Sequence, residues 1–496
     1  MITYLRSGVI YTAMGKYSNV LIQLIVNAVL SRMLNPYDYG VVSVIQVFLL
    51  FFTTLVDAGL GPAIIQNKTL TEHDNRVLFT YSIEFSMLLC LIFAACSPFI
   101  AWFYHDRQYI PLTLAMTSVL FFQGINMVPN ALMDKDKRFK EVNIRLIIAN
   151  VCGGVVGIIG AYFHLGAYAL ILSFVIPAIV AFCLNMWLLR VRPSRKTDRN
   201  SLRKVWKFAK SQFGFNCINY FSRNTDKILV GKLMGAVALG NYSKSYQLLM
   251  MPNTVLLGVL NPVLLPVLSD YQDDVPFVRK SYMKIVHVLA LVGLPLSVFL
   301  CFESKDIIFF LYGNQWTEAV TPFAILALTV WIQMTMSSTG AIFQTLGKTN
   351  YLFWNGCISA FILITATIIG CVKGDLVTLA VSLSIGFLLN FIVIYWLMMS
   401  KTLDSRMGVL LREFITPAIN SIAVAVVFTI CRYFIPDHNT LVNLVLYSFL
   451  FVLVFAAMLR LTGDWRLLFK LFIKEKNNNK TDDATTVNPM TQNSEE

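Results

Sequence analysis

The stretch KYSNVLIQLIVNAVLSRMLNPYDYGVVSVI, residues 16–45, decides the fold, because its pattern returns 200 positions later. Four polar residues lie three or four positions apart on an otherwise apolar segment, which places them in one stripe along a helix. Residues 216–245, NCINYFSRNTDKILVGKLMGAVALGNYSKS, carry a matching stripe. The matched pairs are Lys16 and Asn216, Asn19 and Asn219, Gln23 and Arg223, and Asn27 and Lys227.

The positions after each stripe keep the same register without a gap. The pairs are Arg32 and Lys232, Gly40 and Gly240, Ser43 and Ser243, and Pro62 and Pro262. We interpret the pattern as an internal repeat of a membrane protein. Its two halves are expected to share a polar, partly cationic cavity.

The composition is that of a polytopic membrane protein. Of the 496 residues, 57% are hydrophobic and 14% are charged, whereas a soluble domain carries about 25% charged residues. The net charge of +13 could indicate a nucleic-acid partner. The basic residues cluster in short loops between apolar segments, however, which favours membrane lipids with anionic headgroups as neighbours and no nucleic acid.

Fourteen segments are long and apolar enough to be candidate spans, since a span needs about 20 mostly apolar residues. They are 8–33, 41–66, 77–103, 111–133, 144–163, 166–189, 208–231, 245–268, 283–311, 319–345, 351–372, 376–399, 414–433 and 440–461. Even-numbered connections are rich in Lys and Arg and odd-numbered ones are poor, which predicts that both termini are cytoplasmic. In this scheme Arg145 is assigned to an even-numbered connection, after the fourth segment. Lys244 is assigned to an odd-numbered connection, after the seventh.

The basic loop after the sixth segment divides the repeats. Each half has an even number of segments, so an axis along the membrane normal should relate the two. The fold class is therefore all-α, with fourteen transmembrane helices. The expected parts are an N-lobe at 1–189, a cytoplasmic loop at 190–207, a C-lobe at 208–399, two appended spans at 400–461 and a largely disordered cytoplasmic tail at 462–496.

Charges inside apolar segments are costly, and those that persist usually face a wet cavity or a partner. We expect Lys16, Arg223 and Lys227 to bind an anionic group such as a phosphate. The alternatives are that Arg223 and Asp226, three residues apart, neutralise each other, and that Lys227 extends to the membrane interface.

The neutral members of the stripe are amides, which donate and accept hydrogen bonds without charge and therefore suit sugar hydroxyls. The alternative is hydrogen bonding between helices within the membrane. The amides of the expected cavity are Asn19, Gln23, Asn27, Gln212, Asn216 and Asn219.

Three acidic residues are candidates for an ion pair or for coupling to a proton or a sodium ion: Asp57, Glu84 and Asp226. Asp57 precedes Gly59, Gly61 and Pro62, which would weaken the helix there. No Gly-Lys-Ser/Thr phosphate loop is present, and the His and Cys residues show no metal-like spacing. We therefore expect no enzyme activity, no catalytic residues, no metal and no cofactor.

Two segments resemble a known family. SRMLNPYDYGVVSV, residues 31–44, is similar to the signature of polysaccharide transporters in the multidrug/oligosaccharidyl-lipid/polysaccharide exporter superfamily. YFSRNTDKILVGKLMGAVALGNYSKSYQL, residues 220–248, resembles the colanic-acid-exporter-like oligosaccharide flippases. With fourteen segments and two lobes, the resemblance covers about residues 1–460.

The resemblance implies a V-shaped fold that opens alternately to each side, in the cytoplasmic (inner) membrane of a bacterium. It implies movement of undecaprenyl-diphosphate-linked oligosaccharide to the outer leaflet for O-antigen, capsule or exopolysaccharide synthesis. A polysaccharide polymerase and other assembly proteins are implied partners. The family's cationic cavity would correspond here to Lys16, Arg223 and Lys227.

Two other functions stay open at this stage. A drug or cation exporter of the same superfamily would have a cavity dominated by acids and aromatics. A membrane glycan polymerase or ligase would need a large external loop with Arg and His, and no loop on that side exceeds about 15 residues in this scheme.

Overall fold

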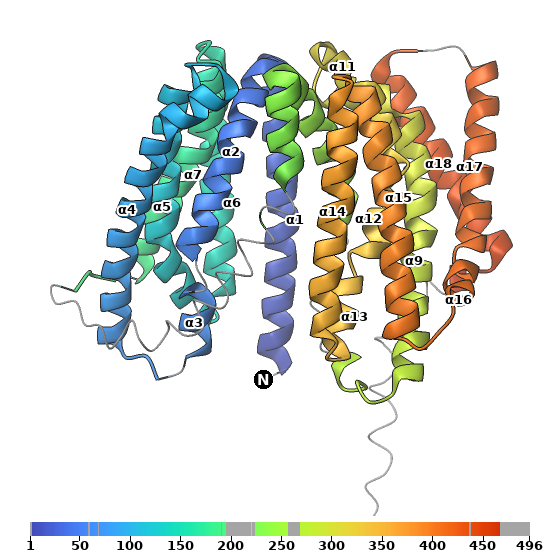
Figure 1. Ribbon diagram of the computed structural model, residues 1–496, viewed down its shortest axis with the longest axis horizontal. Coiled ribbons are helices and arrows are strands. Elements are labelled where there is room, and N and C mark those ends of the chain that lie inside the picture. The colour runs from blue at the N-terminus through green and yellow to red at the C-terminus, as the bar shows by residue number, and fades with distance from the viewer. Residues whose placement is uncertain are drawn as a thin grey trace, which may run out of the picture.

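The computed structural model in Figure 1 describes residues 2–57, 60–67, 69–189, 191–194, 220, 224–255, 268–435 and 438–466. Throughout these ranges the regular secondary structure is helical. The helices stand roughly parallel, and the N-terminus lies at one end of the array, which we call the N-terminal side.

The helices of the first half pack on one another, with α2 to α7 at the left of Figure 1 and α1 in the middle. They are α1 (Ile2–Met33), α2 (Pro36–Asp57), α3 (Leu60–Gln66), α4 (Glu72–Tyr104), α5 (Tyr109–Lys135), α6 (Phe139–Tyr162) and α7 (Ala167–Leu189). α6 lies against both α1 and α7, and α5 lies against both α4 and α7. These contacts place the polar face of α1 beside the interior of the first half.

Local sequence sets several helix ends. Pro36 is the first residue of α2, where its missing N–H is no loss, and the Asn35 side chain accepts a 2.9 Å hydrogen bond from the Asp38 N–H. α4 starts with a capping box, in which Thr71 and Asp74 each accept a hydrogen bond from the other's N–H. Such caps satisfy N–H groups that a helix leaves without intrahelical partners.

The second half begins with the helical residues 224–255, interrupted by the left-handed Gly235 (φ 87°). It continues with α9 (Val275–Phe302), α10 (Ser304–Leu311), η1 (Asn314–Trp316), α11 (Thr317–Ala327), α12 (Val330–Met336), α13 (Thr339–Thr345), α14 (Thr349–Val372) and α15 (Leu376–Lys401). The chain ends its described part with α16 (Met407–Arg412), α17 (Ile415–Phe434) and α18 (Thr440–Thr462).

Ten helices of the described residues are long and apolar enough to cross a membrane, or eleven if one bent pair is a single span. The chain is therefore a multi-pass membrane protein. α1 is not among the ten, because its polar stripe makes it the least apolar of the long helices. The predicted segments 208–231 and 245–268 lie partly outside the described residues.

Two segments predicted as continuous are broken. The segment 283–311 divides at Glu303 into α9 and α10. The segment 319–345 falls into three short helices, with a bend of 53° between Asn314–Ala327 and Val330–Thr345. Near the breaks, Thr329 and Ser337 donate to carbonyls three residues earlier, at 2.7 and 2.6 Å. Hydroxyls that bond back in this way bend helices.

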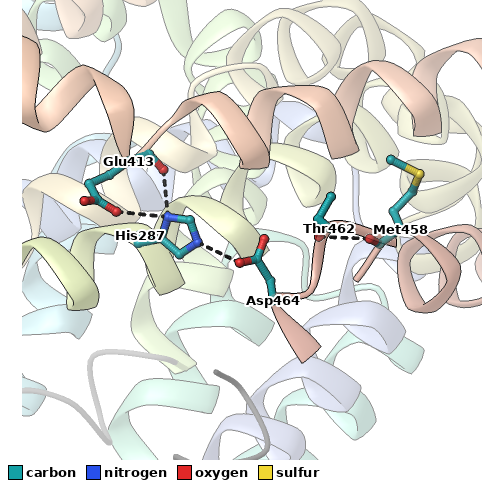
Figure 2. Close-up of polar contacts among 5 residues, drawn as sticks. All are labelled: His287, Glu413, Met458, Thr462 and Asp464. Carbon is teal, nitrogen blue, oxygen red and sulfur yellow. Dashed lines mark hydrogen bonds and ion pairs between the residues drawn. The ribbon is translucent and has the colours of Figure 1, made fainter. Parts of the chain in front are cut away.

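The last two long helices are attached to α9 by polar contacts (Figure 2). His287 lies between two carboxylates: its Nδ1 is 3.2 Å from Glu413 Oε2 and its Nε2 is 3.4 Å from Asp464 Oδ1. At the other end of α17, Arg432 is 3.1 Å from the fully buried Glu303. These two clusters hold α17 and α18 against the second half and lie apart from the cavity described next.

Candidate functional site

A cavity of about 930 Å³ lies between the two halves. Its lining comes from α1, α2, α5, α6 and α7 on one side, and from residues 227–254 with Tyr312 on the other. The volume is near the upper end of the range for small-molecule sites. Gln23 and Asn27 of the first stripe and Lys227 of the second stripe therefore border one space.

The charged side chains of this cavity are basic. Arg145, Lys227 and Lys244 line it, and the described lining includes no Asp or Glu. Arg145 and Lys244 are almost completely buried, with exposed fractions of 5% and 2%. Cations in a lining that includes no acid among its described residues make the cavity suited to an anionic ligand.

Amide side chains line the cavity mainly from the first half. α1, α2, α5 and α6 contribute Gln23, Asn27, Gln46, Gln123, Asn126, Asn130 and Asn150. Within the described second half, Gln247 is the amide of the lining. One wall is therefore rich in neutral donors and acceptors, while two of the three cations come from the facing wall.

Lys244 sits in an aromatic cage at the end of the cavity away from the N-terminal side. Its Nζ lies 3.7 Å from the ring centre of Tyr39, 4.5 Å from that of Tyr312 and 5.4 Å from that of Trp316. It donates to Ser31 Oγ at 2.6 Å and to Asn27 Oδ1 at 3.2 Å. Cation–π contacts and neutral oxygens hold the charge, and residues of both halves provide them.

The matched glycines of the repeat meet beyond this cage. An added Cβ at Gly40 would overlap the carbonyl oxygen of Ala236, and one at Gly240 would overlap that of Pro36. Ala236 and Pro36 are themselves 200 residues apart, so the two contacts are equivalent under the repeat. Here the backbones of α2 and of the helical residues 224–255 cross at a distance that only glycine permits.

The matched cations also reach across symmetrically. Arg32 donates to the Phe310 carbonyl in the second half, and Lys232 donates to the Phe103 carbonyl in the first. Each carbonyl lies near the C-terminal end of its helix, where cations are stabilising. Together with the glycine crossing, these bonds form a seal between the halves. Toward the N-terminal side, a longer hydrogen bond of 3.4 Å joins Tyr17 to the Val255 carbonyl.

The structure places part of the predicted site on the cavity. Gln23, Asn27 and Lys227 line it, whereas Lys16 and Asn19 are not among its lining residues. Lys16 is exposed, and Asn19 accepts a 2.5 Å hydrogen bond from Asn150. The other four predicted residues, Gln212, Asn216, Asn219 and Arg223, lie outside the described residues.

Of the three predicted acids, Glu84 and Asp226 are not among the described lining residues of the cavity. Asp226 accepts a 2.8 Å hydrogen bond from the Tyr242 hydroxyl, and its other oxygen is buried with no hydrogen-bond partner among the described residues. Glu84 is exposed on α4. Asp57 is the last residue of α2, and its side chain is outside the described part.

Two cations assigned to loops by the sequence prove to be cavity residues. Arg145 belongs to α6 and Lys244 to the helix 224–255. Both cations are buried because neutral groups inside the protein stabilise them. Amide oxygens accept hydrogen bonds from Arg145, and the aromatic cage surrounds Lys244. The sequence did contain a pattern that could have predicted the wall beside Arg145. Gln123, Asn126 and Asn130 have the same three- and four-residue spacing as the α1 stripe.

Taken together, the fold and the cavity define a multi-pass helical membrane protein with a cationic, amide-lined cavity. Residues 29–321, more than half of the chain, match the family described as polysaccharide biosynthesis protein, and the chain belongs to that family. Apart from the lining residues between Val20 and Asn27 on α1, the cavity lining falls within this range.

Individual relatives are distant but cover most of the chain. The teichuronic acid biosynthesis protein TuaB of Bacillus subtilis is 24% identical over 79% of this chain and 82% of its own length. The lipopolysaccharide biosynthesis protein WzxC of Escherichia coli is 23% identical over 80% of this chain and 82% of its own length.

Among solved structures, the lipid II flippase MurJ in an inward closed conformation superimposes with a TM-score of 0.72. It has 12% identity and covers 94% of this chain and 100% of its own. An inward-facing multidrug transporter of the MATE family matches with a TM-score of 0.58 and 14% identity, over 79% of this chain and 99% of its own. At such identities these likenesses establish the fold alone.

Proposed function

We propose that the protein is a flippase for undecaprenyl-diphosphate-linked oligosaccharide. It would carry repeat units of a surface polysaccharide from the cytoplasmic to the outer leaflet of the bacterial inner membrane. The observation that carries this proposal is the cavity shared by the two halves, which is lined by three cations, many amides and, in its described part, no acid. A diphosphate suits the cations and a glycan suits the amides.

The names of the relatives support the same substrate class, since TuaB and WzxC are named for teichuronic acid and lipopolysaccharide biosynthesis. MurJ, which shares the fold, is a flippase for lipid II. In the proposed topology both termini are cytoplasmic, and fourteen helices form two lobes of six with two appended. The lobes are residues 1–189 and 208–399.

The proposed cycle starts from the state described here. The seal at Gly40 and Gly240 closes the outer side, so substrate enters from the cytoplasmic side and its lipid tail stays in the bilayer. Binding in the cavity then precedes a rocking of the halves that parts the glycines and opens the outer side. The protein moves its substrate without making or breaking a covalent bond.

Within this proposal Lys16, Arg223 and Lys227 hold the diphosphate, and Lys244 joins them from the closed end. The amides of the α1 stripe and its repeat contact sugar. Asp57, Glu84 and Asp226 are the proposed coupling or ion-pair residues, with a sodium ion or a proton as the coupling ion. A polysaccharide polymerase and other assembly proteins would receive the product.

Complementation tests the proposal. Cells that lack their own flippase are given the wild-type gene or a variant, and surface polysaccharide is measured at equal membrane levels of protein. We expect wild type to restore polymer, and Arg223→Ala and Lys227→Ala each to reduce it at least tenfold. Lys140→Ala, in an exposed turn of α6, is the matched control and should be silent.

The second candidate function is export of drugs or cations, because a multidrug transporter of the MATE family has a similar fold. The basic lining of the cavity argues against it, because cationic drugs would be repelled. Drug resistance conferred by the wild type, in cells where no glycan is restored, would favour this alternative.

A further inference from the structure

One buried cation of the cavity has a setting that the diphosphate does not explain. Arg145 lies on α6 within a candidate span and is 5% exposed. Its Nη1 donates to Asn130 Oδ1 at 2.7 Å and to Asn185 Oδ1. Asn185 in turn donates to Asn126 Oδ1 at 2.7 Å. The guanidinium is thereby fixed against α5 and α7.

The described residues use one nitrogen of this guanidinium. Within the described residues its hydrogen bonds all leave from Nη1 and end on neutral acceptors, and Nε is buried with no partner. Asp134, exposed near the end of α5, acts on Arg145 through space but forms no ion pair with it. The positive charge is therefore largely uncompensated.

A purely structural role accounts poorly for that charge. The three amides could be joined by a neutral side chain without the penalty of burying a cation in a membrane span. Nη2 donates to no described residue, and the side chain lines the cavity, so this nitrogen is suited to an acceptor that arrives with the substrate. A guanidinium already held at one nitrogen has little orientational freedom to lose when a planar carboxylate binds.

The surroundings indicate which part of a substrate this is. Gln123, Asn126 and Asn130 lie three and four residues apart on α5 and, with Arg145, line the cavity. Neutral amides beside a single cation suit hydroxyls beside a single anion. Lys227 and Lys244, by contrast, line the cavity from the second half.

We propose that Gln123, Asn130 and Arg145 form a glycan subsite on the wall of the first half, and that Arg145 binds the carboxylate of an acidic sugar in the repeat unit. Asn126 supports this wall from within, since its amide bonds the Ala178 carbonyl and Asn185. This inference rests on the proposed function. It assigns the acidic sugar to the wall of the first half and the diphosphate mainly to the cations of the other wall. The preferred substrates are repeat units that contain a uronic acid.

Binding to the full-length protein in lipid nanodiscs tests the subsite without requiring transport. Two probes are used, both undecaprenyl-diphosphate-linked trisaccharides, identical except that the terminal sugar is glucuronic acid in one and glucose in the other. We expect wild type to bind the glucuronate probe about tenfold more tightly, and Arg145→Gln to abolish this preference while binding of the glucose probe changes less than twofold.

Two more variants keep the test decisive if Arg145→Gln folds poorly. Asn130→Asp places a carboxylate 2.7 Å from Nη1 in nearly the same volume and should also abolish the preference. Asp134→Asn removes the nearby negative charge and should preserve or increase it. A structural network alone predicts neither of these opposite effects.

The outcomes separate the possible sources of the anion. If Arg145→Gln weakens both probes equally, the guanidinium binds the diphosphate or only shapes the wall, and the subsite is wrong. If wild type shows no preference, it is wrong as well. If wild type binds neither probe, while undecaprenyl diphosphate without sugar is also not bound, it is the proposed function that fails.

Discussion

The glycine crossing gives a direct prediction about the conformational equilibrium. In Gly40→Ala, the new Cβ would overlap the Ala236 carbonyl oxygen and lie 3.0 Å from the Ala236 Cα. Backbone atoms of two packed helices cannot move aside as a side chain can. The two helix ends must therefore part by about 1 Å, which the sealed state resists but an outward-open state does not.

The expected size follows from the cost of overpacking, typically about 1–3 kcal/mol. If the sealed state loses about 2 kcal/mol and the open state nothing, the ratio of open to sealed protein rises about 30-fold. Gly240→Ala should do the same, because its Cβ would overlap the Pro36 carbonyl oxygen and lie 3.2 Å from the Gly40 nitrogen.

Electron–electron distance measurements can read this shift. Spin labels at Arg107 and Lys373 report on the separation of the two halves on the sealed side, in protein whose native cysteines have been replaced. We expect Gly40→Ala to populate a longer distance, and Gly356→Ala, where nothing lies within 4 Å, to match wild type. If Gly40→Ala and wild type give the same distances, the crossing is not the seal.

Three further outcomes follow from buried charges. Lys244→Met should leave thermal stability in detergent unchanged or higher, since a thioether fits an aromatic cage. The same variant should reduce glycan export at least tenfold, and lower stability with normal export would contradict this. Arg432→Ala removes the cation 3.1 Å from buried Glu303 and should lower the stability of the protein by about 3 kcal/mol in thermal unfolding. Adding Glu303→Gln should restore part of this stability, and unchanged stability of Arg432→Ala would refute the pairing. His287→Leu removes the contacts to Glu413 and Asp464, so hydrogen exchange in α17 should accelerate, and unchanged exchange would show that the cluster does not hold this helix.

The repeat carried much of the fold in the sequence itself. Matching Gly40 with Gly240 and Arg32 with Lys232 predicted equivalent positions, and the structure shows each pair in equivalent contacts across the two halves. Register is visible in one sequence because turns and close approaches tolerate few residue types. The cavity members Gln23 and Asn27 were visible because they are polar residues at helical spacing in an apolar segment.

Other features depend on the direction in which a side chain points, which hydropathy does not encode. Arg145 and Lys244 lie at the edges of apolar segments, where a cation usually marks a loop, yet both turn inward to neutral partners. The break at Glu303 was hidden because long apolar runs flank the short polar stretch 303–306. The buried carboxylate is stabilised by Arg432 from a helix distant in sequence.

The most direct test of the account is flipping by the purified protein. Proteoliposomes would contain a fluorescent undecaprenyl-diphosphate-linked oligosaccharide in both leaflets, and a membrane-impermeant reductant would quench the label outside. With wild type, the label should be lost from both leaflets, whereas Lys227→Ala and empty liposomes should keep about half protected. Protection of half the label with wild type, across acidic and neutral glycans, would contradict the account.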